Sequence, residues 1–312
     1  MKICIYGAGV IGCIYAARLH EAGCKVTLLA RNERYATLNQ NGIVIKNVLN
    51  GKQTTTRVPL TRHLETNDRY DLILVTVRLD QLEAVIPDLN GNNASTLIMF
   101  MLNNPDIMET LTNELKQKHI VLGFPGIGGS LENNIIDYIQ IKQQHTTIGE
   151  INGENSVCIS QIKMLFERAG FKVSVSGKIN AWLKIHAVFV ACIAASIINE
   201  NGDSAQLGKK RSSIRTMVQS ISEGFIACKS LGIPIVPANL KIIFLIMPQW
   251  FTIWYWQKAM QGNIGIFAIA PHANKAKNEM QLLAKKVLTM VHSSSFPAPT
   301  LDRLLSSFVN AH

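Results

Sequence analysis

A short apolar strand, a glycine-rich turn and a helix open the chain, and this arrangement constrains the fold more than any other feature. The strand covers residues 2–6, the turn reads Gly-Ala-Gly-Val-Ile-Gly over 7–12, and the helical pattern continues to residue 22. A GxGxxG turn placed between a strand and a helix predicts a dinucleotide-binding site. The chain should therefore begin with the first βαβ unit of a parallel sheet.

Each part of the turn would have a physical task in such a site. Gly7 would make the tight turn, Gly9 would let a pyrophosphate approach the backbone, and Gly12 would let the helix pack closely on the strand. Val10 and Ile11 open the helix, where free backbone N–H groups and the positive end of the dipole favour phosphate. A glycine-rich turn without a ligand is the alternative interpretation.

The second strand, at residues 25–29, indicates which dinucleotide is bound. An NAD site carries an acidic residue near the end of this strand to bind the ribose 2′-OH. Here Ala30-Arg31-Asn32 follows, with Arg34 close behind. None of the residues Ala30-Arg31-Asn32 is a carboxylate that would repel a 2′-phosphate, and a guanidinium can bind one bidentately. The sequence therefore predicts NADP(H); the alternative for Arg31 is a solvated loop charge.

Strand-like and helix-like segments alternate through the first half of the chain, whereas only helical patterns follow residue 178. The alternation predicts a parallel sheet with helices on both faces. We therefore expect an α/β fold, with an NADP-binding Rossmann-type domain over 1–176 and an all-helical domain for substrate binding or dimerisation over 177–312. The glycine-rich stretch at 123–129 is either a plain turn or a loop beside the ligand.

The composition describes a well-packed globular protein. Hydrophobic residues make up 47% of the 312 residues and charged residues 17%, with a net charge of +10. The basic residues are scattered, so nucleic acid is not an expected partner. The apolar stretches at 187–198 and 242–256 are too short or too interrupted to span a membrane. The aromatic cluster of the second stretch would be buried, cover the ligand or join the subunits of a homodimer.

The cysteines predict neither disulfides nor a bound metal. They show no CxxC spacing, and most lie in apolar strand or helix patterns, as buried free thiols do. The chain opens directly on a strand without a signal-peptide pattern, so the cytoplasm is the expected compartment. The six residues are Cys4, Cys13, Cys24, Cys158, Cys192 and Cys228.

Three motifs of the first half together resemble the ketopantoate reductase (2-dehydropantoate 2-reductase) family, and the resemblance extends over essentially the whole chain. They are the glycine turn, Arg31, and the Thr-Val-Arg-Leu-Asp-Gln sequence at 76–81. The family form of the last motif is V-K-x-x-Q, whose lysine assists the 2′-phosphate end of NADP. Arg78 stands in the place of the lysine and Gln81 matches the glutamine. The resemblance implies that both bind the cofactor; an ordinary surface cation is the alternative for Arg78.

The family's Q-N-G motif corresponds here to Asn103-Asn104-Pro105. Asn104 matches the asparagine that lies near the nicotinamide and the substrate, so the resemblance implies contacts with both. Proline in place of glycine lacks an N–H and fixes φ, which changes the loop backbone. An N-cap for the following helix is the alternative role of Asn104.

The family's W-x-K signature on a long helix corresponds to Trp-Leu-Lys at 182–184. The resemblance implies that Lys184 protonates the ketone oxygen, or stabilises the developing alkoxide, as hydride arrives; a lysine that reaches water from the helix edge is the alternative. Two asparagines of the family pattern are replaced by Val188 and Cys192, which predicts a less polar substrate pocket. His186, two positions beyond the lysine, should face elsewhere.

The family's late serine and glutamate stretch is absent. The chain instead resembles a branch with a late H-A…E-M motif, at His272-Ala273 and Glu279-Met280. Glu279 is the expected catalytic partner that tunes the pKa of Lys184, with an exposed helix carboxylate as the alternative. A structural role is favoured for His272.

The leading interpretation is an NADPH-dependent reductase of a 2-oxo acid or related ketone, similar to 2-dehydropantoate 2-reductase. If ketopantoate is the substrate, the chain would serve pantoate and coenzyme A biosynthesis. A reductase of the same fold with a less polar substrate is the second interpretation, and a catalytically silent NADPH-binding regulatory protein is the third. The retained Lys184 favours an enzyme.

Overall fold

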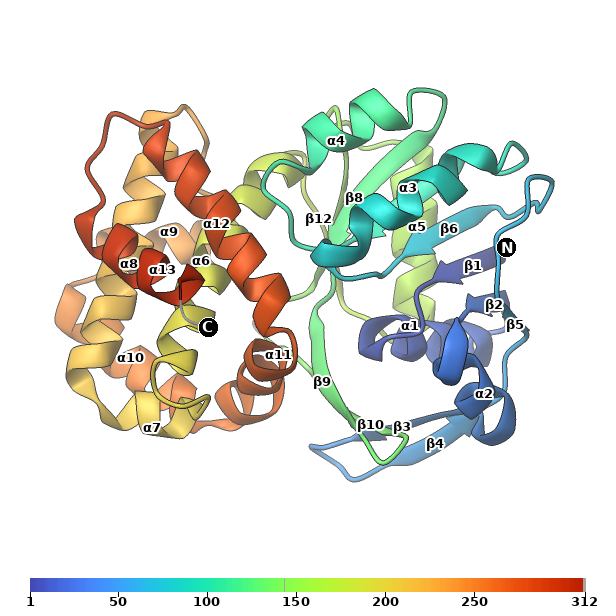
Figure 1. The fold of residues 1–312 in the computed structure, drawn as a ribbon, viewed down its shortest axis with the longest axis horizontal. Helices are drawn as coiled ribbons and strands as arrows, with labels where there is room; N and C mark the ends of the chain where they lie inside the picture. The colour runs from blue at the N-terminus through green and yellow to red at the C-terminus, as the bar shows by residue number, and fades with distance from the viewer. Residues whose placement is uncertain (143, 311–312) are drawn as a thin grey trace. The chain divides into compact units, whose positions relative to one another are not determined.

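The computed structural model describes residues 1–142 and 144–310, apart from the side chains at 109, 112, 268 and 272. Figure 1 shows a chain whose strands all come before a long series of helices. It divides into two compact units. The first contains Met1–Leu102 and Ile107–Ile179, and the second contains Asn103–Asp106 and Asn180–His312.

Eight strands form the main sheet of the first unit, in the order β12-β11-β8-β7-β6-β1-β2-β5. Neighbours pair in parallel except β8 and β11, which are antiparallel. The predicted α/β fold is confirmed, and the buried central strands are apolar on both faces, as parallel sheets require. The strands are β1 (Lys2–Tyr6), β2 (Lys25–Leu29), β5 (Leu60–Thr61), β6 (Leu72–Val75), β7 (Leu97–Met101), β8 (His119–Phe124), β11 (Thr146–Glu150) and β12 (Val173–Val175).

Helices cover both faces of this sheet. On one face, the hydroxyl of Tyr6 in β1 donates a hydrogen bond of 2.5 Å to Asp88 in α3. On the other face, Tyr15 in α1 packs against Phe166 in α5 and Phe171, with ring centroids 5.2 and 4.3 Å away. The helices of this unit are α1 (Val10–Glu21), α2 (Asn32–Asn41), α3 (Leu82–Gly91), α4 (Ile107–Glu114) and α5 (Val157–Arg168), with a 3₁₀ turn at Leu79–Gln81.

A second sheet of four strands, in the order β4-β3-β10-β9, was not expected from the sequence. The interpretation of 123–129 as a loop is wrong, because this stretch forms the end of β8 and the start of β9. A Cβ on Gly129 would lie 2.3 Å from the carbonyl oxygen of Asp137, so this glycine permits close strand pairing. The strands are β3 (Ile43–Asn47), β4 (Gln53–Thr56), β9 (Ile127–Glu132) and β10 (Ile135–Gln140).

The described residues of the second unit form helices and no strands, so the all-helical prediction is confirmed. Its first helix, α6, is long and apolar enough to cross a membrane by length and composition, and 72% of its most apolar window is buried. The helices are α6 (Ile179–Ile198), α7 (Ser204–Lys209), α8 (Arg211–Ser230), α9 (Ala238–Lys241), α10 (Gln249–Gln261), α11 (Ala270–Lys275), α12 (Lys277–His292) and α13 (Pro299–Val309), with π-helical segments at Ile242–Ile246 and Ile264–Ile269.

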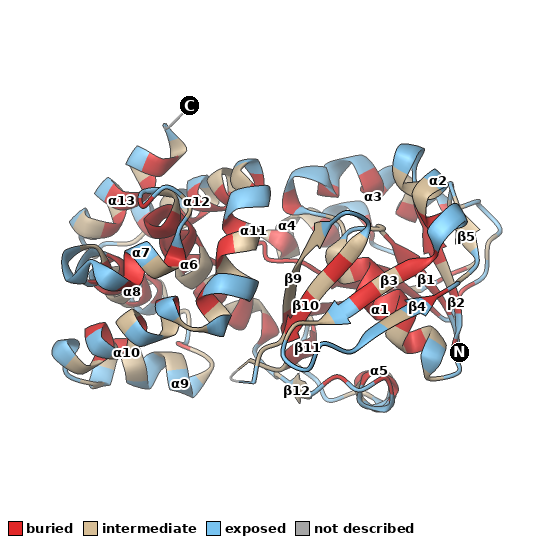
Figure 2. Cartoon of the chain, turned by 90° about the horizontal axis from the view of Figure 1, so that it is seen from below, coloured by how far each residue is buried: buried red, intermediate tan, exposed pale blue. Residues whose placement is uncertain are grey.

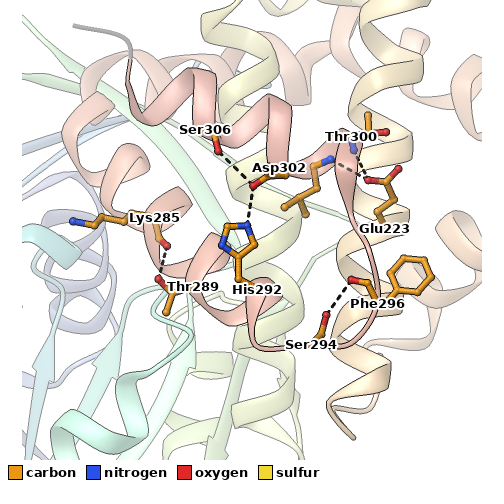
Figure 3. A network of polar contacts seen from close by, with 10 residues as sticks. Glu223, Lys285, Thr289, His292, Ser294, Phe296, Thr300, Asp302 and Ser306 are labelled. Carbon is orange, nitrogen blue, oxygen red and sulfur yellow. Dashed lines mark hydrogen bonds and ion pairs between the residues drawn. The ribbon is translucent and has the colours of Figure 1, made fainter.

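The last two helices are fixed by a polar network around the turn that joins them (Figure 3). Nε2 of His292, at the end of α12, lies 2.8 Å from Oδ1 of Asp302 in α13. The carboxylate of Glu223 in α8 accepts hydrogen bonds of 2.7 and 3.0 Å from the N–H groups of Thr300 and Leu301. A carboxylate at this helix N-terminus satisfies donors that have no partner within the helix.

Replacing Glu223 with alanine should lower the free energy of unfolding by about 1–3 kcal/mol, because two N–H groups lose a charged acceptor. Urea denaturation measures the effect. Glu223→Gln keeps one acceptor oxygen, so its free energy of unfolding should fall by clearly less than that of Glu223→Ala. Equal losses in the two variants would contradict the capping role.

The aromatic cluster at 250–256 divides between the interior and the surface. Trp256 is 7% exposed, and its ring lies 5.4 Å from Phe189 and 5.8 Å from Phe244. Trp250 and Trp254 are 65% and 51% exposed, and Figure 2 shows exposed residues along α10. The buried interpretation therefore holds for Trp256 alone of these three, and the homodimer stays a prediction.

Candidate active site

The glycine turn after β1 has the backbone that a dinucleotide site needs. Gly7 adopts φ +118°, which an L side chain rarely adopts, and a Cβ on Gly12 would lie 1.9 Å from the carbonyl oxygen of Gly7. That same oxygen accepts a hydrogen bond of 3.0 Å from Thr76. Gly9 differs from both, because a Cβ there would meet no atom within 4 Å. Two glycines thus shape the turn, while the third leaves open space beside it.

The open space lies at the start of α1. Gly9 is the exposed N-cap residue and offers no side-chain cap, and Val10 and Ile11 follow it partly exposed. The first N–H groups of a helix have no partner within the helix, so they can bind an anion. Arg34 donates a hydrogen bond of 3.0 Å to the carbonyl oxygen of Ala8, which holds the turn in place.

We expect Gly9→Ala to fold normally and to bind a dinucleotide at least about tenfold more weakly, a loss of roughly 1.4 kcal/mol. The backbone at Gly9 suits alanine and nothing in the protein obstructs the methyl group, so the loss would come from blocked approach of the pyrophosphate. Fluorescence titration and thermal unfolding measure the two properties. Gly91→Ala, also without a neighbour within 4 Å, is the matched control. Unchanged affinity in Gly9→Ala would exclude the pyrophosphate contact.

Arg31 at the end of β2 contacts an acidic residue that the local sequence did not reveal. Its Nη2 lies 2.6 Å from the carboxylate of Asp88 and 2.5 Å from the hydroxyl of Tyr6. The pKa of Tyr6 is raised mainly by burial of the hydroxyl and, to a smaller extent, by its hydrogen bond to Asp88. The expectation of no carboxylate beside Arg31 is therefore wrong, because α3 supplies one. A 2′-phosphate would have to compete with Asp88 for the guanidinium.

Arg78 and Gln81 lie in the 3₁₀ turn region after β6. The guanidinium of Arg78 is half exposed and contacts both carboxylate oxygens of Asp80 at 3.1 Å. The side-chain oxygen of Gln81 accepts a hydrogen bond of 3.3 Å from the N–H of Arg78. The glutamine therefore stabilises the turn, and the cofactor contacts of both residues stay predictions.

The loop at 103–106 belongs to the helical unit, to which two polar contacts attach it. Nδ2 of Asn103 lies 3.3 Å from Nδ1 of His186 in α6. Oδ2 of Asp106 accepts a hydrogen bond of 2.5 Å from Nζ of Lys286 in α12. Asn104 is 2% exposed and accepts a hydrogen bond of 3.3 Å from the N–H of Asp106. This contact supports a turn-forming role for Asn104 just before α4, while its ligand contacts stay a prediction.

His186 is a candidate site residue that the sequence analysis missed. Its ring stacks on that of Trp182, with centroids 4.6 Å apart and planes at 9°, and both residues are buried. The available signal was their separation by four positions, which places both side chains on one helix face. Trp182 thus orients the histidine that contacts Asn103.

Lys184 is partly buried and lies close enough to Cys228 in α8 to affect its titration. Burial raises the pKa of Cys228 to about 12, and the ammonium of Lys184 opposes this rise. Val188 lies one turn further along the same face of α6. It packs so closely against α8 that a Cβ added to Gly224 would lie only 2.5 Å from Cγ1 of Val188. Lys184 therefore lies at the end of a packed seam between two helices.

Val188 and Cys192 have no exposed surface. Val188 packs against α8, and burial together with the charge of Glu223 raises the pKa of Cys192. Both side chains occupy the interior of the helical unit. Direct contact with a substrate stays a prediction that would require the helices to separate.

Glu279 lies in the first turn of α12 and is 8% exposed. The alternative of an exposed helix carboxylate is therefore wrong. A carboxylate in the first turn interacts favourably with the positive end of the helix dipole. Its pairing with Lys184 stays a prediction, and the side chain of His272 lies outside the described residues.

Comparisons with known proteins agree with this arrangement. Residues 3–153 match the family model described as ketopantoate reductase PanE/ApbA. The chain is 26% identical to a 2-dehydropantoate 2-reductase of Pyrococcus horikoshii, over 58% of each chain. It is also 26% identical to an uncharacterized oxidoreductase of Bacillus subtilis, over 62% of this chain and 63% of the relative. These curated relatives are thus matched over less than two thirds of their length.

Solved structures extend the likeness of fold to nearly the whole chain. A 2-dehydropantoate 2-reductase from Geobacter metallireducens has a TM-score of 0.79 at 14% identity and covers 99% of both chains. A ternary structure of D-mandelate dehydrogenase with NADH and anilino(oxo)acetate has a TM-score of 0.80 at 16% identity, covering 99% of this chain and 97% of that one. Residues 3–153 thus resemble the ketopantoate reductase family, and the whole chain shares the fold of these solved structures.

Proposed function

We propose that this protein belongs to the ketopantoate reductase family and is an NADPH-dependent reductase that converts a 2-oxo acid into the corresponding 2-hydroxy acid. The observation that carries the proposal is the glycine turn, in which Gly7 and Gly12 fix the backbone and Gly9 stays open. Lys184, retained on the Trp-x-Lys helix, supplies the acid that ketone reduction needs. A catalytically silent cofactor-binding protein would have no use for a lysine at this costly position.

When bound, NADPH supplies the hydride that adds to the ketone carbon. The ammonium of Lys184 would then donate a proton to the oxygen that gains negative charge. Arg31 and the start of α1 would bind the phosphates, and Asn103 with His186 would fix the loop that precedes α4. Proton donation by the ammonium leaves a neutral amine, which takes up a proton from water again after the product departs.

Relatives support the substrate class. The names of the proteins similar to this chain include 2-dehydropantoate 2-reductase and D-mandelate dehydrogenase. Their substrates share a carboxylate next to a ketone or hydroxyl carbon. We therefore infer a 2-oxo acid. We infer a less polar one than ketopantoate because two amide side chains of the family pattern are absent, and the residues in their places, Val188 and Cys192, are fully buried and offer no amide to a substrate.

We expect weak turnover of ketopantoate and faster turnover of a bulkier, less polar 2-oxo acid such as phenylglyoxylate. A site without hydrogen-bonding partners for a substrate hydroxyl cannot select strongly for it. The decisive experiment measures oxidation of NADPH and of NADH with a panel of 2-oxo acids.

Two results of this experiment would overturn parts of the proposal. A kcat/KM for ketopantoate of about 10⁴ M⁻¹s⁻¹ or more would contradict the less polar substrate. Tight NADPH binding without turnover of any 2-oxo acid would favour the silent regulatory protein.

A further inference from the structure

Three metal-ligating side chains of the first unit come together away from the glycine turn. They are His119 at the start of β8, Glu150 at the end of β11 and Cys158 in the first turn of α5, and one ligand atom of each lies within 4.8 Å of the other two. We propose that they form a binding site for a divalent transition-metal ion of the Zn²⁺ type.

The fold brings these residues together from rigid elements. Glu150 pairs with Val121 across the antiparallel β8–β11 ladder, and His119 lies two residues from Val121. Side chains alternate along a strand, so the imidazole and the carboxylate extend from the same face of the sheet. Cys158 reaches this face from α5, whose N-cap Ser156 donates a hydrogen bond of 2.5 Å to Glu150. The ligand positions therefore do not depend on a flexible loop.

The charge of Glu150 gives a reason for a cation at this position. The residue is 5% exposed, and burying a carboxylate is costly unless it is paired or bound to a metal. Among the described residues, His119 is the one ion-pair partner of Glu150, at 2.8 Å, and an imidazole is a cation only when protonated. A bound divalent ion would compensate the carboxylate at any pH at which it binds.

The donor set selects the kind of metal. One sulfur, one nitrogen and one oxygen donor match Zn²⁺, whereas Ca²⁺ and Mg²⁺ prefer oxygen donors alone. Three protein ligands leave a fourth tetrahedral position for water. The side chain of His119 is 47% exposed, which gives an ion a route from solvent.

Binding must release a proton from the thiol. The free thiol carries this proton, and the thiolate is the form that coordinates a metal ion. A metal binds the thiolate, and its affinity therefore rises with pH. Sequence spacing gave no sign of this site, since its ligands come from three separate elements.

The test is a titration of the chelator-treated full chain with Co²⁺, followed by displacement with Zn²⁺. We expect saturation at one ion per chain and a near-ultraviolet thiolate-to-cobalt charge-transfer band. Cys158→Ser should abolish the band, and His119→Ala should weaken binding at least about tenfold. His63→Ala removes another exposed histidine of the same unit and should change neither the charge-transfer band nor the affinity for the metal.

Thermal unfolding gives a second measurement that does not depend on the cobalt spectrum. Zn²⁺ should raise the melting temperature of the unaltered protein but not that of His119→Ala, whose exposed side chain can be removed without disturbing the core. The proposal is overturned if the unaltered protein shows no charge-transfer band with excess Co²⁺. It is equally overturned if Cys158→Ser keeps the band.

Discussion

Lys184→Ala should lower turnover by about 10²–10⁴-fold, the range typical of a lost general acid, while leaving cofactor affinity nearly unchanged. The ammonium belongs to α6 of the helical unit, whereas the glycine turn belongs to the other unit. Removing the side chain should therefore affect proton donation and not nucleotide binding. Steady-state kinetics with the best 2-oxo acid and fluorescence titration with NADPH measure the two properties separately.

Two matched variants sharpen this test. Lys184→Arg keeps the positive charge but cannot release a proton readily, so it should stay impaired if proton donation is the role and recover if charge alone matters. Lys178→Ala removes an exposed lysine just before α6 and should behave like the unaltered protein. Normal turnover in Lys184→Ala would show that another group is the acid.

The second large effect concerns the choice of cofactor. Arg31→Ala should weaken NADPH binding at least about tenfold, because a charge-assisted contact contributes roughly 1.5–3 kcal/mol, and should hardly change NADH binding. Asp88→Asn should have the opposite effect, since it removes the negative charge 2.6 Å from the guanidinium. Fluorescence titration of both cofactors gives the ratio of affinities in each variant.

The pair of variants distinguishes two roles for Asp88. If it only competes with a 2′-phosphate, Asp88→Asn raises NADPH affinity and leaves NADH affinity unchanged. If it binds the ribose 2′-OH, as acidic residues do in NAD sites, the same variant weakens NADH instead. An equal loss of both cofactors in Arg31→Ala would contradict a specific contact with the phosphate. Arg215→Ala, at an exposed position of α8, controls for the change in net charge.

Elements with a strong local pattern were predictable from the sequence. The opening strand, turn and helix follow from residue spacing and from three glycines, and the structure gives α1 as Val10–Glu21 after β1. The long helices of the second unit follow from helical periodicity alone. In both cases the information lies within a few residues, which is the range over which periodicity acts.

Contacts between distant segments were not predictable in this way. The pairing of β3 with β10, the approach of Asp88 to Arg31 and the contact of Asn103 with His186 each join separate parts of the chain. No spacing rule connects such residues. The glycine stretch at 123–129 was misinterpreted for the same reason, since the need for glycine at 129 arises from a neighbouring strand.

The helical unit is discontinuous, because it includes Asn103–Asp106 from the middle of the chain. A fragment that begins at residue 180 would lose the asparagine that contacts His186 and the aspartate that contacts Lys286. Gene fusion or domain shuffling that treats 180–312 as a portable module would therefore separate it from four residues encoded far upstream.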